Sequence, residues 1–202
     1  MSEPVGAHVS ERWAHWRARV DLSEYHSRWA RMEAAGQTAH GEADLIEALW
    51  SRAGGDGAVL DAGCGMGRVA IELARRGIPV EGADLDDDLL AFARNDAPHI
   101  TWHLADLATM QLATRYSMVA MPGNVMIFCS PDVRADVVER AAAHLHPGGL
   151  LVAGFSLDGI TLDEYDRYCA AASLTLADRF ATWEREPYDG GNYSVSVHRL
   201  VT

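Results

Sequence analysis

The stretch VLDAGCGMG, residues 59–67, decides how this sequence is expected to fold. The apolar run that contains it predicts a buried strand, and GRVAIELARRG, residues 67–77, predicts an amphipathic helix that ends at Gly77. Glycines at positions 63, 65 and 67 form the turn between them. A strand that leads through a glycine-rich turn into a helix is typical of parallel α/β sheets, where ligands bind at the carboxyl ends of the strands.

Short apolar runs alternate with amphipathic helices through the rest of the chain. The expected further strands are residues 78–83, 100–105, 116–121, 150–155, 174–186 and 193–201. Helices are expected to begin at Asp86, at Pro131 after a Ser130 cap, and at a capping box of Thr161 and Glu164. The last two strands are joined by a short turn, so the closing pair must include an antiparallel strand.

These patterns together predict the fold class. We expect an α/β, Rossmann-like three-layer sandwich with a mostly parallel seven-stranded sheet and an antiparallel terminal strand. Residues from about Ser10 to Trp50 carry a helical pattern with a break at Gly36, and their aromatic side chains are interpreted mainly as helix-packing core. We therefore predict an N-terminal helical extension or lid at 1–50 and one α/β domain at 51–202.

Composition excludes several classes of function. The 202 residues contain 17 arginines, no lysine and 29 acidic residues, giving a net charge of -12, which argues against a nucleic-acid partner. Cys64, Cys129 and Cys169 form no C-x-x-C pair, so we expect reduced thiols in a cytoplasmic protein. The sequence shows no secretory signal, no membrane-spanning run and no metal-ligand cluster, and it leaves a monomer and a homodimer equally open.

Three aspartates lie at the ends of successive predicted strands. Asp61 precedes the glycines, where it suits a cationic amino group and would repel a pyrophosphate. The dinucleotide pattern G-x-G-x-x-G also fails, because Arg68 occupies its final position. Asp84 stands where an acid commonly binds a ribose diol, and Asp106 could accept a hydrogen bond from an adenine amino group. Capping of the following helices, or bonds to loop amides, are the alternative roles for these carboxylates.

With its motifs in this order, the sequence resembles class I S-adenosylmethionine-dependent methyltransferases. Its segments VLDAGCGMGRVA, GADLD, LADL and HLHPGGLLVAGF resemble the family's successive motifs, and the likeness extends over about residues 41–155 and the C-terminal tail. The resemblance implies S-adenosylmethionine as cofactor and S-adenosylhomocysteine as product. It implies that Asp61 lies near the methionine amino group, that Asp84 binds the ribose with Leu85 beside the adenine, and that Asp106 binds the adenine amino group.

The set of cofactor-binding residues that this resemblance implies is wider. It comprises Asp61, Ala62, Gly63, Cys64, Gly65, Gly67, Asp84, Leu85, Ala105, Asp106, Leu107, Met121 and Asn124. A sulfonium is already activated, so the protein mainly has to align the acceptor and exclude water, and a general base is optional.

No catalytic residue is identified from the sequence. Candidate catalytic residues are Asn124, His26, His40 and Tyr25, and candidate substrate-binding residues are Tyr25, Trp29 and Arg31. No large insertion follows the fifth predicted strand, which favours a small-molecule methyl acceptor over a protein. The alternatives are an NAD(P)-dependent oxidoreductase and a non-catalytic protein that binds S-adenosylmethionine.

Overall fold

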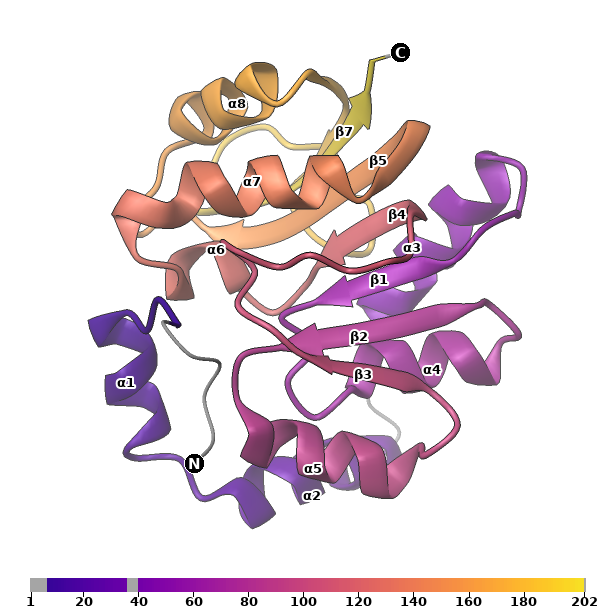
Figure 1. The fold of residues 1–202 in the computed structure, drawn as a ribbon, viewed down its shortest axis with the longest axis vertical. Helices are drawn as coiled ribbons and strands as arrows, with labels where there is room; N and C mark the ends of the chain where they lie inside the picture. Colours follow the sequence, from indigo (N-terminus) through magenta and orange to yellow (C-terminus); the bar gives the residue numbers. More distant parts are fainter. Residues whose placement is uncertain (1–6, 36–39, 202) are drawn as a thin grey trace.

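A computed structural model describes residues 7–35 and 40–201 of the chain. Its centre is a seven-stranded sheet in the order β3-β2-β1-β4-β5-β7-β6 (Figure 1). The strands are β1 Val59–Ala62, β2 Val80–Asp84, β3 Thr101–Leu104, β4 Tyr116–Met121, β5 Leu145–Ser156, β6 Leu174–Phe180 and β7 Tyr193–Leu200. The first five pair in parallel, whereas β7 is antiparallel to both β5 and β6. The predicted fold class and the antiparallel terminal strand are confirmed.

Helices cover both faces of this sheet (Figure 1). They are α3 Gly41–Arg52, α4 Arg68–Arg75, α5 Asp87–Asp96, α6 Val125–Phe128, α7 Arg134–Ala143 and α8 Leu162–Ala171, with a 3-10 turn at Pro131–Val133. Helices α7 and α8 share one buried apolar core with the sheet, and α3 and α4 share a second core with the opposite face. The structure is therefore the expected three-layer sandwich.

Side-chain caps set the starts of α5 and α8. Asp86 caps α5 by accepting hydrogen bonds from the amides of Asp88 and Leu89, and Thr161 caps α8 through the amide of Glu164. The prediction that the Ser130 side chain caps a helix is wrong, because this side chain makes no cap hydrogen bond. A turn closed by the bond from the amide of Val133 to the carbonyl of Ser130 precedes α7 instead.

Two strand predictions differ from the structure by five residues or more at one end. Strand β5 begins at Leu145, five residues earlier than expected, because that residue pairs with Tyr116 before a register shift in the β4–β5 ladder. Strand β6 ends at Phe180 and does not reach residue 186. The amide of Ala181 bonds to the carbonyl of Glu186, which turns the chain away from the sheet.

The N-terminal segment forms two helices before residue 36, where the sequence predicts one. They are α1 Glu11–Arg17 and α2 Leu22–Ala34. Ser10 caps α1 through the amide of Trp13, and the Asp21 carboxylate accepts a hydrogen bond from the amide of Glu24, which starts α2 in a new direction. Gly36, the expected break, lies outside the described residues.

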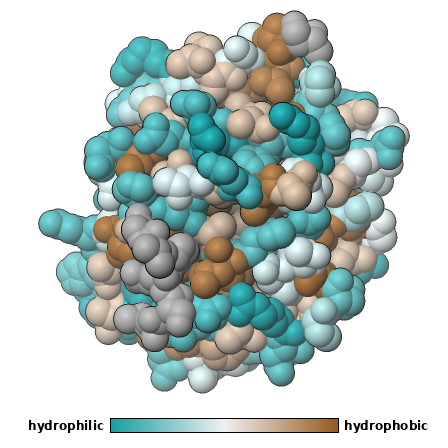
Figure 2. Space-filling view, in the orientation of Figure 1, coloured by the Kyte–Doolittle hydropathy of each residue, from teal (hydrophilic) through white to brown (hydrophobic). Residues whose placement is uncertain are grey.

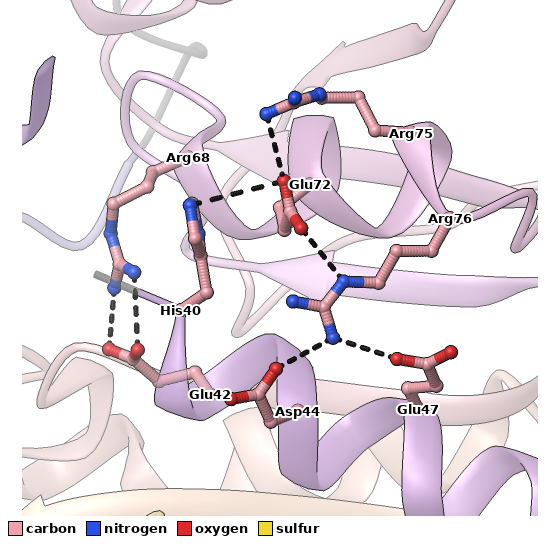
Figure 3. A network of polar contacts seen from close by, with 8 residues as sticks. All are labelled: His40, Glu42, Asp44, Glu47, Arg68, Glu72, Arg75 and Arg76. Atoms are coloured by element: carbon pink, nitrogen blue, oxygen red, sulfur yellow. Dashed lines mark hydrogen bonds and ion pairs between the residues drawn. The ribbon is translucent and has the colours of Figure 1, made fainter. Parts of the chain in front are cut away.

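Helix α3 belongs to the packed core, unlike α1. Leu45, Ile46 and Leu49 are buried against the sheet in the same core as α4. Arg76, just after α4, also bonds to carboxylates of both helices, including Glu47 at 2.7 Å (Figure 3). The core thus favours a boundary before residue 41 and not at residue 50, and the division into extension and domain stays a proposal.

The surface of the described chain is largely hydrophilic. In the face shown in Figure 2, brown residues are scattered among teal and white ones and do not form one patch. The large hydrophobic side chains that are exposed among the described residues are Leu176 and Val201. No helix in ranges 7–35 and 40–201 is long and apolar enough to cross a membrane.

Candidate cofactor and substrate cavity

A cavity of about 320 Å³ lies at the carboxyl ends of β1 to β4. Residues of α1 and α2 line its far side, and α1 lies beyond the arrowheads of β1 and β2 (Figure 1). The side that the sheet edge forms, with the loops that follow the strands, is called here the floor, and the side that α1, α2 and α6 form is called the roof. The floor carries carboxylates and the roof carries aromatic rings.

The glycine turn of the floor needs residues without a side chain. Gly63 has a φ of 78°, and a Cβ added there would lie 2.6 Å from the Cγ2 atom of Val125. Gly67 has a φ of 81°, and a Cβ there would lie 2.5 Å from the ring of Trp102. Positive φ and close packing therefore fix glycine at both positions.

Asp61 lies in β1 at the cavity wall and is 1 % exposed. Its Oδ2 atom accepts a hydrogen bond of 3.1 Å from the amide of Ala70, whereas its Oδ1 atom has no hydrogen-bond partner among the described residues. Burial raises the pKa of this carboxyl to about 7. A buried acceptor without a donor is costly, so this site is suited to a ligand with a positively charged donor.

Asp84, the last residue of β2, holds the glycine turn in place. Its Oδ2 atom accepts a hydrogen bond of 2.8 Å from the amide of Gly65, and its Oδ1 atom accepts one of 3.0 Å from the amide of Asp86. Burial raises the pKa of Asp84 to about 6. Each carboxylate oxygen has two lone pairs, so both oxygens can still accept hydrogen bonds from ligand hydroxyl groups.

Asp106 follows β3 and is joined to the N-terminal segment. Its Oδ1 atom accepts a hydrogen bond of 2.8 Å from the amide of Ala108. Its Oδ2 atom lies 2.7 Å from the backbone nitrogen of His8 and 2.8 Å from the Nδ1 atom of the same residue. A ligand amino group at Asp106 would therefore share or replace the contact with His8.

An arginine–glutamate pair also lines the cavity. The guanidinium of Arg68, at the start of α4, forms two hydrogen bonds to the carboxylate of Glu42 in α3, at 3.1 and 2.5 Å (Figure 3). Arg28 of α2 is a further basic residue on the wall. The guanidinium of Arg68 places positive charge near Asp61, where an aminoacyl ligand would carry a carboxylate.

Aromatic rings from three helices form the roof. Trp16 is their centre, with ring centroids 4.9 Å from Trp13, 5.5 Å from Tyr25 and 6.0 Å from Phe128. The packing interpretation of the two tryptophans therefore needs correction. They do pack, but against one another and Phe128 at the cavity wall, and α1 contains no buried residue.

The structure brings together part of the expected cofactor-binding set. The members on the cavity wall are Asp61, Gly63, Cys64, Gly65, Asp84, Leu85, Asp106 and Leu107. Ala62 and Met121 are buried in the apolar core, Ala105 packs beside it and Gly67 contacts Trp102, so these four are not among the lining residues.

Asn124 lies after the glycine at the end of β4 and is not among the lining residues either. Its φ of 68° is left-handed, and its Oδ1 atom accepts a hydrogen bond of 2.7 Å from the amide of Ser156. A role as a turn residue accounts for both observations.

The remaining candidates also divide into residues that line the cavity and residues that do not. Tyr25 lines the cavity, whereas His26 pairs with Asp96 of α5 at 2.5 Å. His40 lies 4.0 Å from Glu72 in the polar network of Figure 3 and is not a lining residue. Arg31 is exposed on α2, and the side chain of Trp29 lies outside the described part of the structure.

Sequence reasoning missed several residues that line the cavity. They are His8, Trp13, Trp16, Arg28, Glu42, Arg68 and Phe128. The three-residue spacing of the two tryptophans on a polar helix is the signal that could have indicated a shared face. Nothing in the sequence indicates that Phe128, which lies in the short helix α6, meets them.

The cavity contains thiols but no thiolate at neutral pH. Burial raises the pKa of Cys129 to about 12 and raises the pKa of Cys64 well above its usual value. Burial also raises the pKa of the Tyr25 hydroxyl. These three groups stay protonated, so the arrangement is suited to binding and alignment rather than to attack by a cysteine.

A glycine turn with carboxylates at three strand ends defines an α/β protein that binds a nucleoside with an attached cationic group. Residues 59–149 match a family model described as a methyltransferase domain. A TehB-like SAM-dependent methyltransferase from Corynebacterium glutamicum has a similar solved structure, with 32% sequence identity and a TM-score of 0.79 over 87% of this chain and 96% of that one. The chain belongs to the S-adenosylmethionine-dependent methyltransferases, as its motifs predicted.

This chain matches a smaller share of two curated relatives. A dTDP-3-amino-3,6-dideoxy-alpha-D-glucopyranose N,N-dimethyltransferase from Streptomyces fradiae is 33% identical over 59% of this chain and 48% of its own length. A magnesium-protoporphyrin O-methyltransferase from Rhodobacter capsulatus is 33% identical over 40% of this chain and 38% of its own. The chain thus spans half or less of these relatives, one named for a nitrogen and one for an oxygen acceptor.

Proposed function

We propose that this chain binds S-adenosylmethionine in the cavity and transfers its methyl group to a small-molecule acceptor. The observation that carries the proposal is Asp61, whose buried Oδ1 atom has no hydrogen-bond partner among the described residues and whose carboxyl lies at the cavity wall. A cationic amino group would supply the missing donor and stabilise the ionised carboxylate. A pyrophosphate at the same place would be repelled.

The neighbouring side chains fit the rest of that cofactor. Arg68 would receive the carboxylate of the aminoacyl part, because its guanidinium lines the same end of the cavity as Asp61. Asp84 would accept hydrogen bonds from the ribose hydroxyls, and Asp106 would accept one from the adenine amino group in place of His8 or beside it. Family membership of the chain supports these assignments.

The chain contributes alignment and exclusion of water. When bound, the sulfonium supplies an activated methyl group, which needs a nucleophile in line with the bond that breaks. The roof helices cover the strand ends and shield them from solvent, with α1 and α2 held by the contacts of Arg17 and His26 to α5. Tyr25, Cys64 and Cys129 stay protonated and do not act as bases.

A small acceptor is supported by the size of the cavity and by the names of the relatives. A volume of about 320 Å³ is near the lower end of ligand pockets, which range from about 300 to 1,000 Å³. Both curated relatives are named for small-molecule acceptors. We also propose a cytoplasmic location, which the three free cysteines support.

Ligand-induced stabilisation tests the proposal. At one hundred times its Kd, S-adenosylhomocysteine should stabilise the protein by about 2.7 kcal/mol, which raises the Tm by roughly 5 to 10 °C. NAD, NADH and NADP at the same concentration should leave the Tm unchanged. Stabilisation by NADH alone would overturn the assignment, and formation of a methylated product from any small acceptor would exclude a non-catalytic binding role.

A further inference from the structure

We propose that the acceptor is a small amine and that the aromatic roof, made of Trp13, Trp16, Tyr25 and Phe128, holds the positive charge that this amine acquires. This inference rests on the proposed methyl transfer and names the substrate class for it. Four aromatic rings from three separate helices converge on one wall of the cavity. Aromatic faces attract cations, and quaternary ammonium groups are recognised by such clusters.

The charges around the cavity favour a cation over an anion. Four carboxylates line the wall, from Asp61, Asp84, Asp106 and Glu42, against the two guanidinium groups of Arg28 and Arg68. One of these guanidiniums is already bonded to Glu42. An anionic acceptor would meet a net negative wall, whereas an amine or its methylated ammonium would be attracted to it.

Size restricts the acceptor further. The same space of about 320 Å³ has to accommodate both the cofactor and the acceptor. A space of this size favours a compact acceptor over a nucleotide-linked sugar. The roof side chains are only partly buried, so a compact ligand can reach their faces.

The reaction itself keeps a positive charge under the roof. The amine first loses a proton to solvent, and the lone pair of the neutral nitrogen then forms the new N–C bond as the C–S bond breaks and its electron pair passes to sulfur. The charge thereby moves from sulfur to nitrogen, and an amine that still carries a hydrogen then loses a proton to solvent. An alcohol holds its proton far more tightly than an ammonium group does, and among the roof rings burial keeps the Tyr25 hydroxyl protonated, so the roof itself does not activate an alcohol.

The test compares a cation with its neutral isostere. Choline and 3,3-dimethyl-1-butanol have the same shape and differ in charge, and each is titrated by calorimetry into the full chain saturated with S-adenosylhomocysteine. Choline should bind about 2- to 30-fold more tightly, the range expected for a cation–aromatic contact. Equal or weaker binding of choline would overturn the inference.

Substitutions of Trp16 assign any preference to the roof. Trp16→Leu should lower the choline preference, whereas Trp16→Phe, which keeps an aromatic face, should retain most of it. Because α1 has no buried residue, both variants are expected to fold, and the pair Trp13→Leu and Trp13→Phe provides a second comparison. A preference that survives both leucine substitutions would overturn the inference.

The affinity for S-adenosylhomocysteine is measured first in every protein. If the wild type does not bind S-adenosylhomocysteine, the proposed function itself fails. If it binds S-adenosylhomocysteine but shows no preference for choline, only the amine assignment fails.

Discussion

The floor and the roof of the cavity are built in different ways. On the floor, Asp84 is held by the amides of Gly65 and Asp86, and Asp61 by the amide of Ala70, while the contact of Asp106 with His8 is the long-range exception. On the roof, Trp16 and Phe128 are more than one hundred residues apart in sequence and meet only through the fold. The floor is therefore a local property of strand ends, whereas the roof is a tertiary contact.

This difference predicts that the floor and the roof have separate functions. The floor should determine whether the cofactor binds, because its aspartates are buried and Asp61 keeps an acceptor atom without a partner among the described residues. The roof should determine which acceptor binds, because it is partly exposed and attached by a few polar contacts such as that of Arg17 with α5. Substitutions on the two sides should consequently change different measured quantities.

The largest effect is expected from the packing of the glycine turn. Gly63→Ala combines a positive φ with a Cβ placed 2.6 Å from Val125, and should lower the free energy of unfolding by about 2 to 5 kcal/mol. Gly65→Ala has a positive φ but no atom within 4 Å of the added Cβ, so about 1 to 2 kcal/mol is expected. Urea titration of both variants measures the difference. Equal losses in the free energy of unfolding would show that the Val125 side chain moves to make room for the added Cβ.

Removal of the strand-two carboxylate should mainly reduce cofactor affinity. Asp84→Ala deletes the acceptor for the ribose hydroxyls, each hydrogen bond contributing about 1 to 3 kcal/mol when its partner stays buried, so the affinity should fall by about 30-fold or more. Calorimetry with S-adenosylhomocysteine measures it. Asp87→Ala removes an equal charge from the next helix without touching the cavity and serves as the control. Unchanged affinity in Asp84→Ala would show that the ribose lies elsewhere.

The affinity for S-adenosylhomocysteine should also depend on pH through Asp61. Its pKa is raised to about 7, so the carboxylate that binds the amino group is lost as the pH falls below that value. Affinity should rise by up to about tenfold between pH 6 and 7.5, below the ordinary pKa of an α-amino group at about 7.7 to 8.0. In Asp61→Asn the affinity should be lower and nearly independent of pH. A wild-type affinity that falls over this interval would contradict the assignment.

The smallest effect is expected from the attachment of the roof. Arg17→Ala removes bonds of 2.6 Å to both Asp86 and Asp88 and should change the affinity for S-adenosylhomocysteine by less than about 1 kcal/mol, with a smaller effect at high salt. Chymotryptic cleavage at the roof tryptophans should become faster while the Tm stays nearly unchanged. Arg19→Ala, whose side chain bonds only to the carbonyl of His15 among the described residues, is the control. A large decrease in the Tm of Arg17→Ala would contradict the prediction that the attachment of the roof contributes little to stability.

The sequence predicted the floor more fully than the roof. The strand that contains Asp61, the glycine turn after it and the acid at Asp84 form a pattern within 26 residues, and the structure places both acids at the cavity. Asn124 and Met121, inferred from the loop after the fourth strand, are not lining residues. Which side of a turn a side chain takes depends on partners such as the Ser156 amide, which the local pattern does not contain.

The sequence by itself determined the layered sheet, its antiparallel end and the acidic, glycine-rich edge, because hydrophobic period, helix caps and turn glycines act over a few residues. Only the tertiary structure decided that α3 packs in the core while α1 and α2 close the cavity, and that Phe128 and Trp16 share its wall. The physical reason is that an amphipathic pattern shows which face of a helix is apolar, but not which surface that face will cover.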